Sequence, residues 1–177
     1  MIRDYSRSEM LEIWRKRAGF ETAEESCNVE VYDGMDVNQF LEQRMRRWYL
    51  ELLDRGDQRV TDVEDVYASC HTEPYSGGCT KLSVPLMTRK LISCRLPGWK
   101  RAAAPEEGTT ALLAREGNPY CRADSLHPRV LSFQNYYLCF PAANPDFGIP
   151  EEVMVTTDTG PELYRVDDGV LADINVF

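Results

Sequence analysis

The sequence feature that most constrains the fold is a wide apolar stripe between residues 37 and 55. Asp36 and Gln39 form a capping signal before the stripe, and Gly56 follows Arg55, as is typical of a helix C-terminus. Apolar residues that recur at steps of three and four predict one long amphipathic helix over 37–55. Its expected apolar face consists of Val37, Phe40, Leu41, Met45, Trp48, Leu52 and Leu53.

A second, shorter helix is expected near the N-terminus, over residues 8–18. Ser6 and Glu9 have the spacing of a capping box. The apolar positions that follow at helical spacing are Met10, Leu11, Trp14 and Ala18. Residues 21–34, between the two helices, are rich in acids and predict a connecting loop with one strand-like piece at 29–32.

After residue 60 the sequence changes to short apolar or alternating runs bounded by glycine and proline, which are typical of β-strands. Gly77-Gly78 predicts a hairpin turn between two of these runs. The expected strands are 66–72, 79–84, 90–96, 129–134, 136–140, 152–157 and 163–166. A single helical turn is expected at 62–66, and Thr109 or Thr110 is expected to cap a short helix over 111–115. The last ten residues give no clear pattern.

These elements predict an α+β fold in which two N-terminal helices pack on a mostly antiparallel sheet, with a small inserted lobe at about 100–145. A length of 177 residues suits one ordinary domain, so residues 1–177 are expected to form a single domain. Within it, 1–60 form a helical part, 61–166 a β-rich part and 167–177 a C-terminal tail. The predicted core contains Leu11, Trp14, Leu41, Trp48, Leu52, Leu82, Val84, Leu91, Ile92, Leu138 and Phe140.

Composition narrows the class of protein. Hydrophobic residues make up 43% and charged residues 28% of the chain, as in an average globular protein. No window holds about 18 consecutive apolar residues, and the N-terminus leads into a charged helix rather than an apolar signal core. The chain is therefore expected to be soluble and unsecreted, without a membrane partner.

The net charge of −9, from 20 Lys+Arg and 29 Asp+Glu, is concentrated near the C-terminus. Residues 145–177 carry eight acids and one base and contribute −7 of this charge. A groove that grips phosphates needs clustered Lys and Arg, which this segment lacks. The acids are expected to form a solvated acidic face. They are Asp146, Glu151, Glu152, Asp158, Glu162, Asp167, Asp168 and Asp173.

The six cysteines show no paired metal-ligand spacing. They are Cys27, Cys70, Cys79, Cys94, Cys121 and Cys139. Even the nearest two, Cys70 and Cys79 with His71 alongside, miss the two-to-four-residue spacing of a zinc knuckle. Three disulfides would be possible by count, but buried thiols in a reducing cytoplasm are favoured because Cys94 and Cys139 lie in apolar, strand-like runs.

No residue is predicted to be catalytic, to bind a cofactor or to ligate a metal. His71 and His127 are the only histidines, and the sequence contains no phosphate loop, dinucleotide-binding glycine motif, nucleophile elbow or zinc-protease motif. The acid pairs Asp167-Asp168 and Glu151-Glu152 would point to opposite faces of a strand, so solvated acids are favoured over a metal site or an acid–base pair. The chain is therefore expected not to be an enzyme.

Basic clusters flank two tryptophans in the expected helices. Arg15-Lys16-Arg17 follow Trp14, and Arg44, Arg46 and Arg47 precede Trp48. Such clusters can bind nucleic acid, but long cationic side chains also flank buried tryptophans, and the structural interpretation is favoured. In Tyr136-Tyr137 one ring is expected to face the core, and the other faces outward, where it can serve an interface.

The order of elements from about 37 to 166 resembles the head-to-tail connector adaptors of tailed phages, especially the tail-tubular type of short-tailed phages and prophages. The similar features are a strand ending at Pro85, a positioned Arg89, the strand Leu91–Leu96, and a hairpin that runs from Pro128–Leu131 to Tyr136–Pro141. The sequence departs from this family at its end. Members usually finish with a helix that packs on the first two, whereas residues 170–174 allow one turn at best.

The resemblance implies a virion structural protein, made in the cytoplasm, that docks between a portal-like ring and later tail proteins or joins copies of itself in a ring. It implies no catalytic residue and no cofactor. DNA would at most pass non-specifically, and the acidic tail would shorten its dwell time through charge repulsion. The alternative is a small cytoplasmic ligand-binding or partner-binding module.

Overall fold

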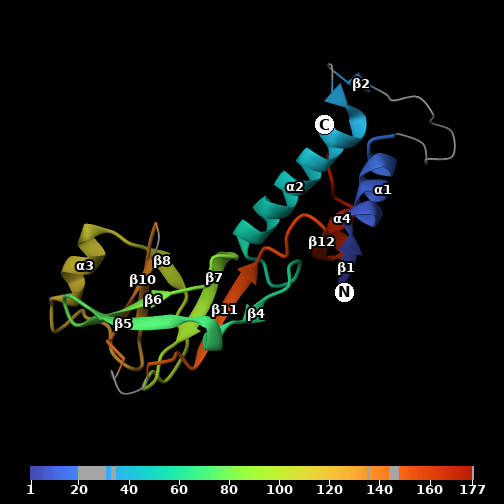
Figure 1. Cartoon of the computed structure of the whole chain (residues 1–177). Coiled ribbons are helices and arrows are strands. Elements are labelled where there is room, and N and C mark those ends of the chain that lie inside the picture. The colour runs from blue at the N-terminus through green and yellow to red at the C-terminus, as the bar shows by residue number, and fades with distance from the viewer. Residues whose placement is uncertain (20–30, 33–34, 135, 144–147, 177) are drawn as a thin grey trace. The chain divides into compact units, whose positions relative to one another are not determined.

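The computed structural model describes residues 1–19, 31–32, 35–134, 136–143 and 148–176 (Figure 1). The chain divides into two compact units: unit 1 comprises residues 1–62 and 157–177, and unit 2 comprises residues 63–156. The α+β class with antiparallel sheets is confirmed. The boundary lies near the expected change of pattern at residue 60, but residues 157–177 return to the helical unit. The prediction that residues 1–177 form a single domain stays a prediction.

Unit 1 contains helices and two pairs of short strands. In chain order its elements are β1 (Ile2–Ser6), α1 (Arg7–Arg17), β2 (Val31–Tyr32), β3 (Met35–Asp36), α2 (Val37–Arg55), β12 (Leu163–Asp167) and α4 (Asp168–Leu171). β1 and β12 pair antiparallel with Ile2 opposite Asp167, so the two ends of the chain meet. The loop predicted over 21–34 lies largely outside the described residues.

The two long helices form where their capping residues predict them. α1 begins with a complete capping box between Ser6 and Glu9, and α2 ends at Gly56, which adopts φ 67° and therefore favours glycine. Helix 37–55 is confirmed, and helix 8–18 is confirmed with each end shifted by one residue. The predicted sheet partner is corrected, because α1 and α2 pack on each other and α1 packs on the β1–β12 pair.

The core of unit 1 is closed by aromatic side chains from helix and strand. Trp14 meets Trp48 edge-to-face with ring centroids 5.8 Å apart, and Tyr49 meets Tyr164 at 4.9 Å. The C-terminal residues after α4 also belong to this core, since Ile174 and Val176 are buried in it. The described part of the predicted tail, residues 167–176, is therefore a packed segment and not a free tail.

Unit 2 contains two sheets and two short helical segments. Its elements are β4 (Glu64–Asp65), the 3-10 turn η1 (Tyr67–Ser69), β5 (His71–Tyr75), β6 (Cys79–Ser83), β7 (Thr88–Arg95), β8 (Pro105–Glu107), α3 (Thr110–Glu116), β9 (Arg129–Phe133), β10 (Tyr136–Phe140) and β11 (Glu152–Thr157). One sheet has the order β5-β6-β10-β9-β8 and the other β4-β11-β7. β8 pairs parallel with β9, and the other pairs of the five-stranded sheet are antiparallel.

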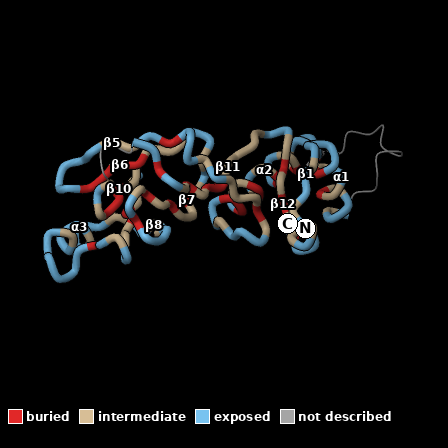
Figure 2. Tube along the Cα trace, turned by 90° about the horizontal axis from the view of Figure 1, so that it is seen from below, coloured by how far each residue is buried: buried red, intermediate tan, exposed pale blue. Residues whose placement is uncertain are grey.

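The five-stranded sheet buries both of its faces, as strand alternation requires. On one face Leu82, Val130 and Cys139 share a core with Leu91 of β7 and Val153 of β11. On the opposite face the buried residues are Cys79, Ala123, Leu131, Leu138 and Phe140, with Leu112 of α3 packed against them. Figure 2 shows these buried positions recurring along the strands. We call the second face the outer face.

Most strand predictions hold, but several details are corrected. Strands 136–140 and 152–157 and the Gly77-Gly78 hairpin are confirmed. The strand expected at 66–72 begins only at His71, and the helical turn expected at 62–66 lies at 67–69. No strand is among those expected before Thr109, yet residues 105–107 form β8, whose parallel partner β9 supplies hydrogen bonds that no local pattern shows. The inserted part is the whole of unit 2, because β9 and β10 lie inside its main sheet rather than in a lobe at 100–145.

The predicted core is confirmed for seven of its eleven residues. Trp14, Leu41, Leu52, Leu82, Leu91, Leu138 and Phe140 are buried. Leu11, Trp48, Val84 and Ile92 are only partly buried, although they pack at the edges of the cores or on the strands themselves.

Candidate functional site

The candidate site is a hollow on the outer face of the five-stranded sheet. α3 and the segment after it cover only part of this face, and a hollow of about 390 Å³ remains beside the helix. We call it the outer hollow. It is lined by Tyr75, Ser76, Gly77, Cys79, Leu113, Glu116, Gly117, Phe133, Tyr136, Leu138 and Phe140.

Two hairpins and one helix bring these side chains together. Tyr75 pairs with Cys79 at the end of the β5–β6 hairpin, and Tyr136 pairs with Phe133 at the end of the β9–β10 hairpin. Thr109 caps α3, as the sequence predicted, by accepting a hydrogen bond from the Leu112 N–H at 3.2 Å. The cap fixes the start of α3 and so places Leu113 and Glu116 at the hollow.

The ring of Phe133 lies close to Gly108, the residue directly before the Thr109 cap of α3, and this contact favours glycine there. A Cβ built at this position would lie 2.4 Å from the Cζ atom of Phe133, well inside van der Waals contact. The Phe133 ring therefore occupies the space that any other residue's side chain would need.

The aromatic wall of the hollow is continuous. The rings of Phe133 and Tyr136 stack with centroids 5.3 Å apart, and Tyr75 lies 5.9 Å from Tyr136. Hydrogen bonding to Tyr75 raises the pKa of Tyr136. Lys81 places its Nζ 5.6 Å from the Tyr136 ring centroid and donates to Glu73 at 2.7 Å, which raises the pKa of Lys81. The raised pKa keeps Tyr136 uncharged at physiological pH, and the charge of Lys81 beside it is balanced by Glu73.

The charged group at the floor of the hollow is already paired. Glu116 forms an ion pair with Arg129, and the side chains are only 7% and 15% exposed. The second carboxylate oxygen of Glu116 accepts a hydrogen bond from the Ala123 N–H at 2.9 Å. Because its carboxylate is satisfied, the hollow presents apolar and aromatic surface together with uncharged polar groups to a guest.

The two histidines are not brought to this site. His71 is exposed at the start of the edge strand β5. His127 is exposed, and its Nδ1 lies 3.3 Å from Asp124. Within the described ranges, no group of three or more His, Cys, Asp or Glu side chains is arranged to hold a metal ion.

Four cysteines are buried free thiols, as predicted, but Cys121 is exposed. Burial raises the pKa of Cys70 to about 11 and also raises that of Cys79. A hydrogen bond with Cys94, together with burial, raises the pKa of Cys139 well above its usual range. Cys121 differs because it lies in the irregular segment after α3, outside the apolar strands that bury the other four. Cys27 lies outside the described residues.

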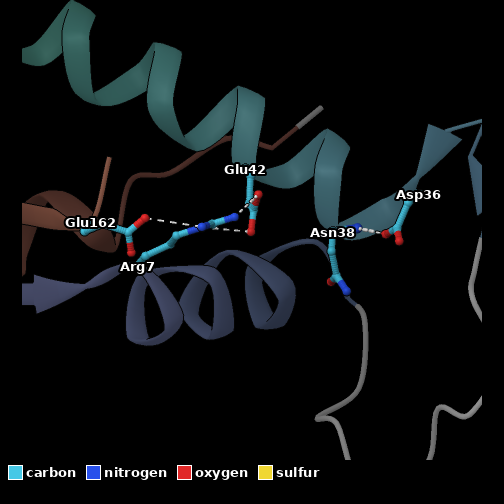
Figure 3. A network of polar contacts seen from close by, with 5 residues as sticks. All are labelled: Arg7, Asp36, Asn38, Glu42 and Glu162. Carbon is cyan, nitrogen blue, oxygen red and sulfur yellow. Dashed lines mark hydrogen bonds and ion pairs between the residues drawn. The ribbon is translucent and has the colours of Figure 1, made fainter. Parts of the chain in front are cut away.

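The predicted solvated acidic face is corrected, because several of its acids pair with bases. Figure 3 shows Arg7 between two carboxylates, 2.8 Å from Glu42 and 3.3 Å from Glu162. Further pairs join Asp158 to Arg46, Asp167 to the N-terminal ammonium, Asp168 to Arg3 and Glu151 to Arg95. The fold brings the acidic C-terminal segment of unit 1 against the basic side chains of its first helices, which local sequence does not reveal.

The structural interpretation of the basic helical clusters is supported. Arg44 donates to the carbonyl of Val176 at 3.0 Å, and Arg46 donates to the carbonyl of Gly160 at 2.9 Å. Arg47 pairs with Glu51 at 3.0 Å, and Arg15 donates to Asn38. These guanidinium groups are used to hold unit 1 together.

The tyrosine pair divides as predicted. Tyr137 packs against the core between the two sheets, while Tyr136 lies on the opposite face, in the outer hollow. The sequence therefore predicted an outward-facing ring at this pair, but it did not predict Tyr75, Leu113 or Glu116 as residues of the site. Tyr75 ends β5, whose sequence His-Thr-Glu-Pro-Tyr shows no apolar alternation. Leu113 and Glu116 reach the site only through the packing of α3.

Comparison with known proteins assigns no family: no protein-family model matches the chain, and no curated protein matches it. None of the helices in the described part of the chain is long and apolar enough to cross a membrane.

Proposed function

We propose that the chain is a structural protein–protein interaction subunit, of the kind found in phage and prophage head-to-tail connectors. In this role it docks between a portal-like ring and later tail proteins, performs no catalysis and lets DNA pass at most non-specifically. The contact surfaces are the turns and strand ends of unit 2.

The observation that carries the proposal is where the large apolar side chains are exposed. Among the described residues, all of those exposed on the surface except Met1 lie in unit 2. They are Tyr67, Tyr75, Leu86, Met87, Leu113, Tyr120, Leu126 and Ile149. They lie on several turns, strand ends and short helical segments of unit 2, so this unit offers more exposed apolar surface to a partner than unit 1 does.

The element order that resembles the connector family is supported in part by the pairing of strands. β9 and β10 form a hairpin in which Arg129, next to Pro128, pairs with Phe140, next to Pro141. The acidic tail no longer supports the proposal, because many of its carboxylates are neutralised by ion pairs.

The test is docking to a portal protein encoded beside this chain. We expect genes for a portal, a capsid protein or a large terminase in the neighbourhood, and ring-shaped particles by negative-stain microscopy when the purified portal and this chain are mixed. A neighbourhood of metabolic genes, together with no binding to any portal, would contradict the proposal.

The outer hollow favours a second candidate, a small ligand-binding or partner-binding module. Its volume of about 390 Å³ falls within the range of small-molecule pockets. Saturable micromolar binding of a small apolar metabolite, with Tyr136→Ser abolishing it, would favour this candidate over the connector.

A further inference from the structure

The turn after α3 holds an aromatic side chain almost entirely in solvent. Tyr120 is 95% exposed, whereas Tyr67 and Tyr75, the next most exposed aromatic side chains that the structure describes, are 45% and 40% exposed. Tyrosine is enriched at protein–protein interfaces, because its ring is apolar while its hydroxyl forms hydrogen bonds. The turn therefore offers an anchor to a partner.

The backbone of this turn is held by hydrogen bonds. The Tyr120 N–H donates to the Asn118 Oδ1 at 3.0 Å, and the Arg122 N–H donates to the Asn118 carbonyl at 2.9 Å. At the far side of the turn, Ala123 is buried on the outer face and donates to Glu116 at 2.9 Å. The exposure of Tyr120 is thus built into the turn, and a partner that covers the ring loses less entropy than it would by ordering a loose loop.

Unpaired bases lie on both sides of the tyrosine. Arg115, in the last turn of α3, and Arg122 are exposed and form no ion pair with any residue that the structure describes. Lys100 is likewise exposed and unpaired, and its backbone N–H donates to the Ser125 carbonyl at 2.8 Å, which joins it to the same segment. We call Lys100, Arg115, Tyr120 and Arg122 the basic turn.

The acids of this segment do not neutralise the basic turn. Residues 115–125 contain two acids, Glu116 and Asp124. Glu116 forms its ion pair with Arg129. Asp124 accepts hydrogen bonds from the backbone N–H groups of Leu126 at 2.8 Å and His127 at 2.7 Å. The guanidinium groups of the basic turn are therefore available to a partner's carboxylates.

This combination distinguishes the basic turn from the other exposed apolar positions. Within the described part of the chain, Tyr120 is the one exposed apolar side chain that has an unpaired arginine within five residues on each side. Tyrosine and arginine are among the residue types that contribute most to binding energy at protein interfaces. The composition of the turn is thus that of an interface centre.

The charge of the chain favours a protein partner over a nucleic acid. Arginine and tyrosine also bind single-stranded nucleic acid, by contacting phosphates and stacking on bases. A nucleic acid spreads its charge over many phosphates, so it would also meet the field of a chain with net charge −9. Unit 2 itself has nine Lys+Arg and ten Asp+Glu and offers no surplus of positive charge. A short acidic protein segment needs only the bases of the turn.

We propose that the basic turn is a docking site for an acidic segment of a protein partner. Carboxylates of the segment pair with Arg115 and Arg122, since a guanidinium group binds a carboxylate through two parallel hydrogen bonds. An apolar side chain of the segment covers the ring of Tyr120. This inference rests on the proposed interaction function, and it names the chemistry of the partner and the place where it binds.

The experiment is fluorescence anisotropy of the full chain with a labelled peptide that alternates glutamate and proline. This peptide is extended and carries both carboxylates and apolar rings. A peptide of glutamine and proline is the uncharged control, and a single-stranded oligothymidylate tests the nucleic acid alternative. The turn variants are Tyr120→Ser and Arg122→Ser. The matched controls are Tyr67→Ser and Arg59→Ser, which change exposed residues outside the basic turn.

We expect saturable binding of the glutamate peptide that is at least about tenfold weaker for each turn variant, as for central residues of an interface, and unchanged for the matched controls. Tyr120→Phe should bind as the wild type does, because it keeps the ring. Added salt should weaken binding, since it screens exposed charges. All the substituted side chains are exposed, so circular dichroism should be the same for every variant.

Four results would overturn the docking site: no saturable binding of the glutamate peptide, equal binding of the glutamine peptide, turn variants that bind as the wild type does, or tighter binding of the oligothymidylate. Portal binding is measured separately on the same proteins. Equal portal binding by the wild type and Tyr120→Ser would refute the docking site and leave the connector proposal standing. Peptide binding that depends on the turn, without portal binding, would refute the connector and leave the docking site standing.

Discussion

The two units differ in the contacts that hold them together and in the side chains that they leave exposed. Unit 1 is built from the two ends of the chain, and Arg7, Arg46 and Arg165 join its helices and strands through ion pairs and hydrogen bonds. Unit 2 is built from one continuous segment and leaves large apolar side chains uncovered at its turns. The two units therefore differ in exposed apolar surface: among the described residues, every large exposed apolar side chain except Met1 lies in unit 2.

The two units also differ in which segments of the chain each one needs in order to fold. In unit 2, β4 near the start pairs with β11 near the end, with Glu64 opposite Val155. Unit 2 therefore closes by itself. Unit 1 needs both chain ends, and if unit 2 unfolds, unit 1 must close a loop of 94 residues, from 63 to 156. Closing such a loop costs about 4 kcal/mol.

The largest expected contrast is among the cysteines, which in the described residues all lie in unit 2. In a Cys27→Ser background at pH 8, Cys121 should react with a thiol reagent at least about 10³-fold faster than the buried thiols, which react only when unit 2 opens. The raised pKa of Cys70, about 11, keeps that thiol protonated as well. Mass spectrometry of labelled peptides measures the rates.

The pH dependence gives this prediction a second test. A folded-state pKa above the unfolded value favours the folded state at low pH, and that advantage is lost as pH rises from about 9 towards 11. The labelling contrast should therefore narrow over this range. Equal rates for Cys121 and the buried thiols at pH 8 would contradict the packing of unit 2.

Substitutions in the two cores should destabilise the two units to different extents. Trp14→Ala in unit 1 is expected to cost about 3–5 kcal/mol and Leu131→Ala in unit 2 about 2–5 kcal/mol of unfolding free energy, since both side chains are fully buried. Leu131→Ala should speed labelling of Cys94 and Cys139 and also weaken hydrogen-exchange protection in α2. Trp14→Ala should weaken protection in α2 alone. If both substitutions speed labelling equally, the chain behaves as the single domain expected from its length.

A smaller effect compares a buried ion pair with an exposed one. Arg129→Met leaves the Glu116 carboxylate buried without its partner and should cost about 3 kcal/mol in a denaturant titration. Arg47→Met is the matched control in unit 1, where the pair with Glu51 is well exposed, and should change stability by less than about 0.5 kcal/mol. Similar costs would mean that the Arg129 pair is hydrated.

The smallest effect concerns the α1 capping box. Ser6→Ala removes the side-chain oxygen that accepts from the Glu9 N–H and should cost about 1 kcal/mol of unit 1 stability. Hydrogen bonds from Ser6 lower the pKa of Glu9, so the cap is complete above its usual pKa and is lost as pH falls through the lowered value. The difference in thermal stability between wild type and variant should therefore shrink at low pH to the part that the Ser6 oxygen contributes by accepting from the Glu9 N–H. A constant difference would show that Glu9 is not part of the cap.

Sequence reasoning recovered the elements whose signals are local. Helix 37–55 was predicted residue for residue because Asp36 and Gly56 mark its ends and its apolar stripe is wide. The β9–β10 hairpin and the Thr109 cap were likewise visible in short windows. β1 and β8 were missed because each is short and exists only through a partner distant in the chain, β12 and β9.

The candidate site was predicted only in one residue, Tyr136, through the alternation of a strand. The remainder of the outer hollow depends on which strands become neighbours and on where α3 lies over the sheet. The acidic segment was misjudged for the same reason: charge counts along a chain do not reveal that Glu162 will lie beside Arg7. Local sequence patterns predict individual helices and strands, whereas contacts between distant segments determine which side chains meet on the surface.

The pairing of β1 with β12 also delays the completion of unit 1 while the chain is being synthesised. Ser6 pairs with Leu163, which is synthesised 157 residues later, so the pair cannot form before then. At ribosomal rates of about 5–20 residues per second this delay is roughly 8–30 s. During that interval unit 2 emerges complete and can fold, while the apolar faces of α1 and α2 have no strand to cover them. Until β12 is made, α1 and α2 can therefore pack only on each other and on β1.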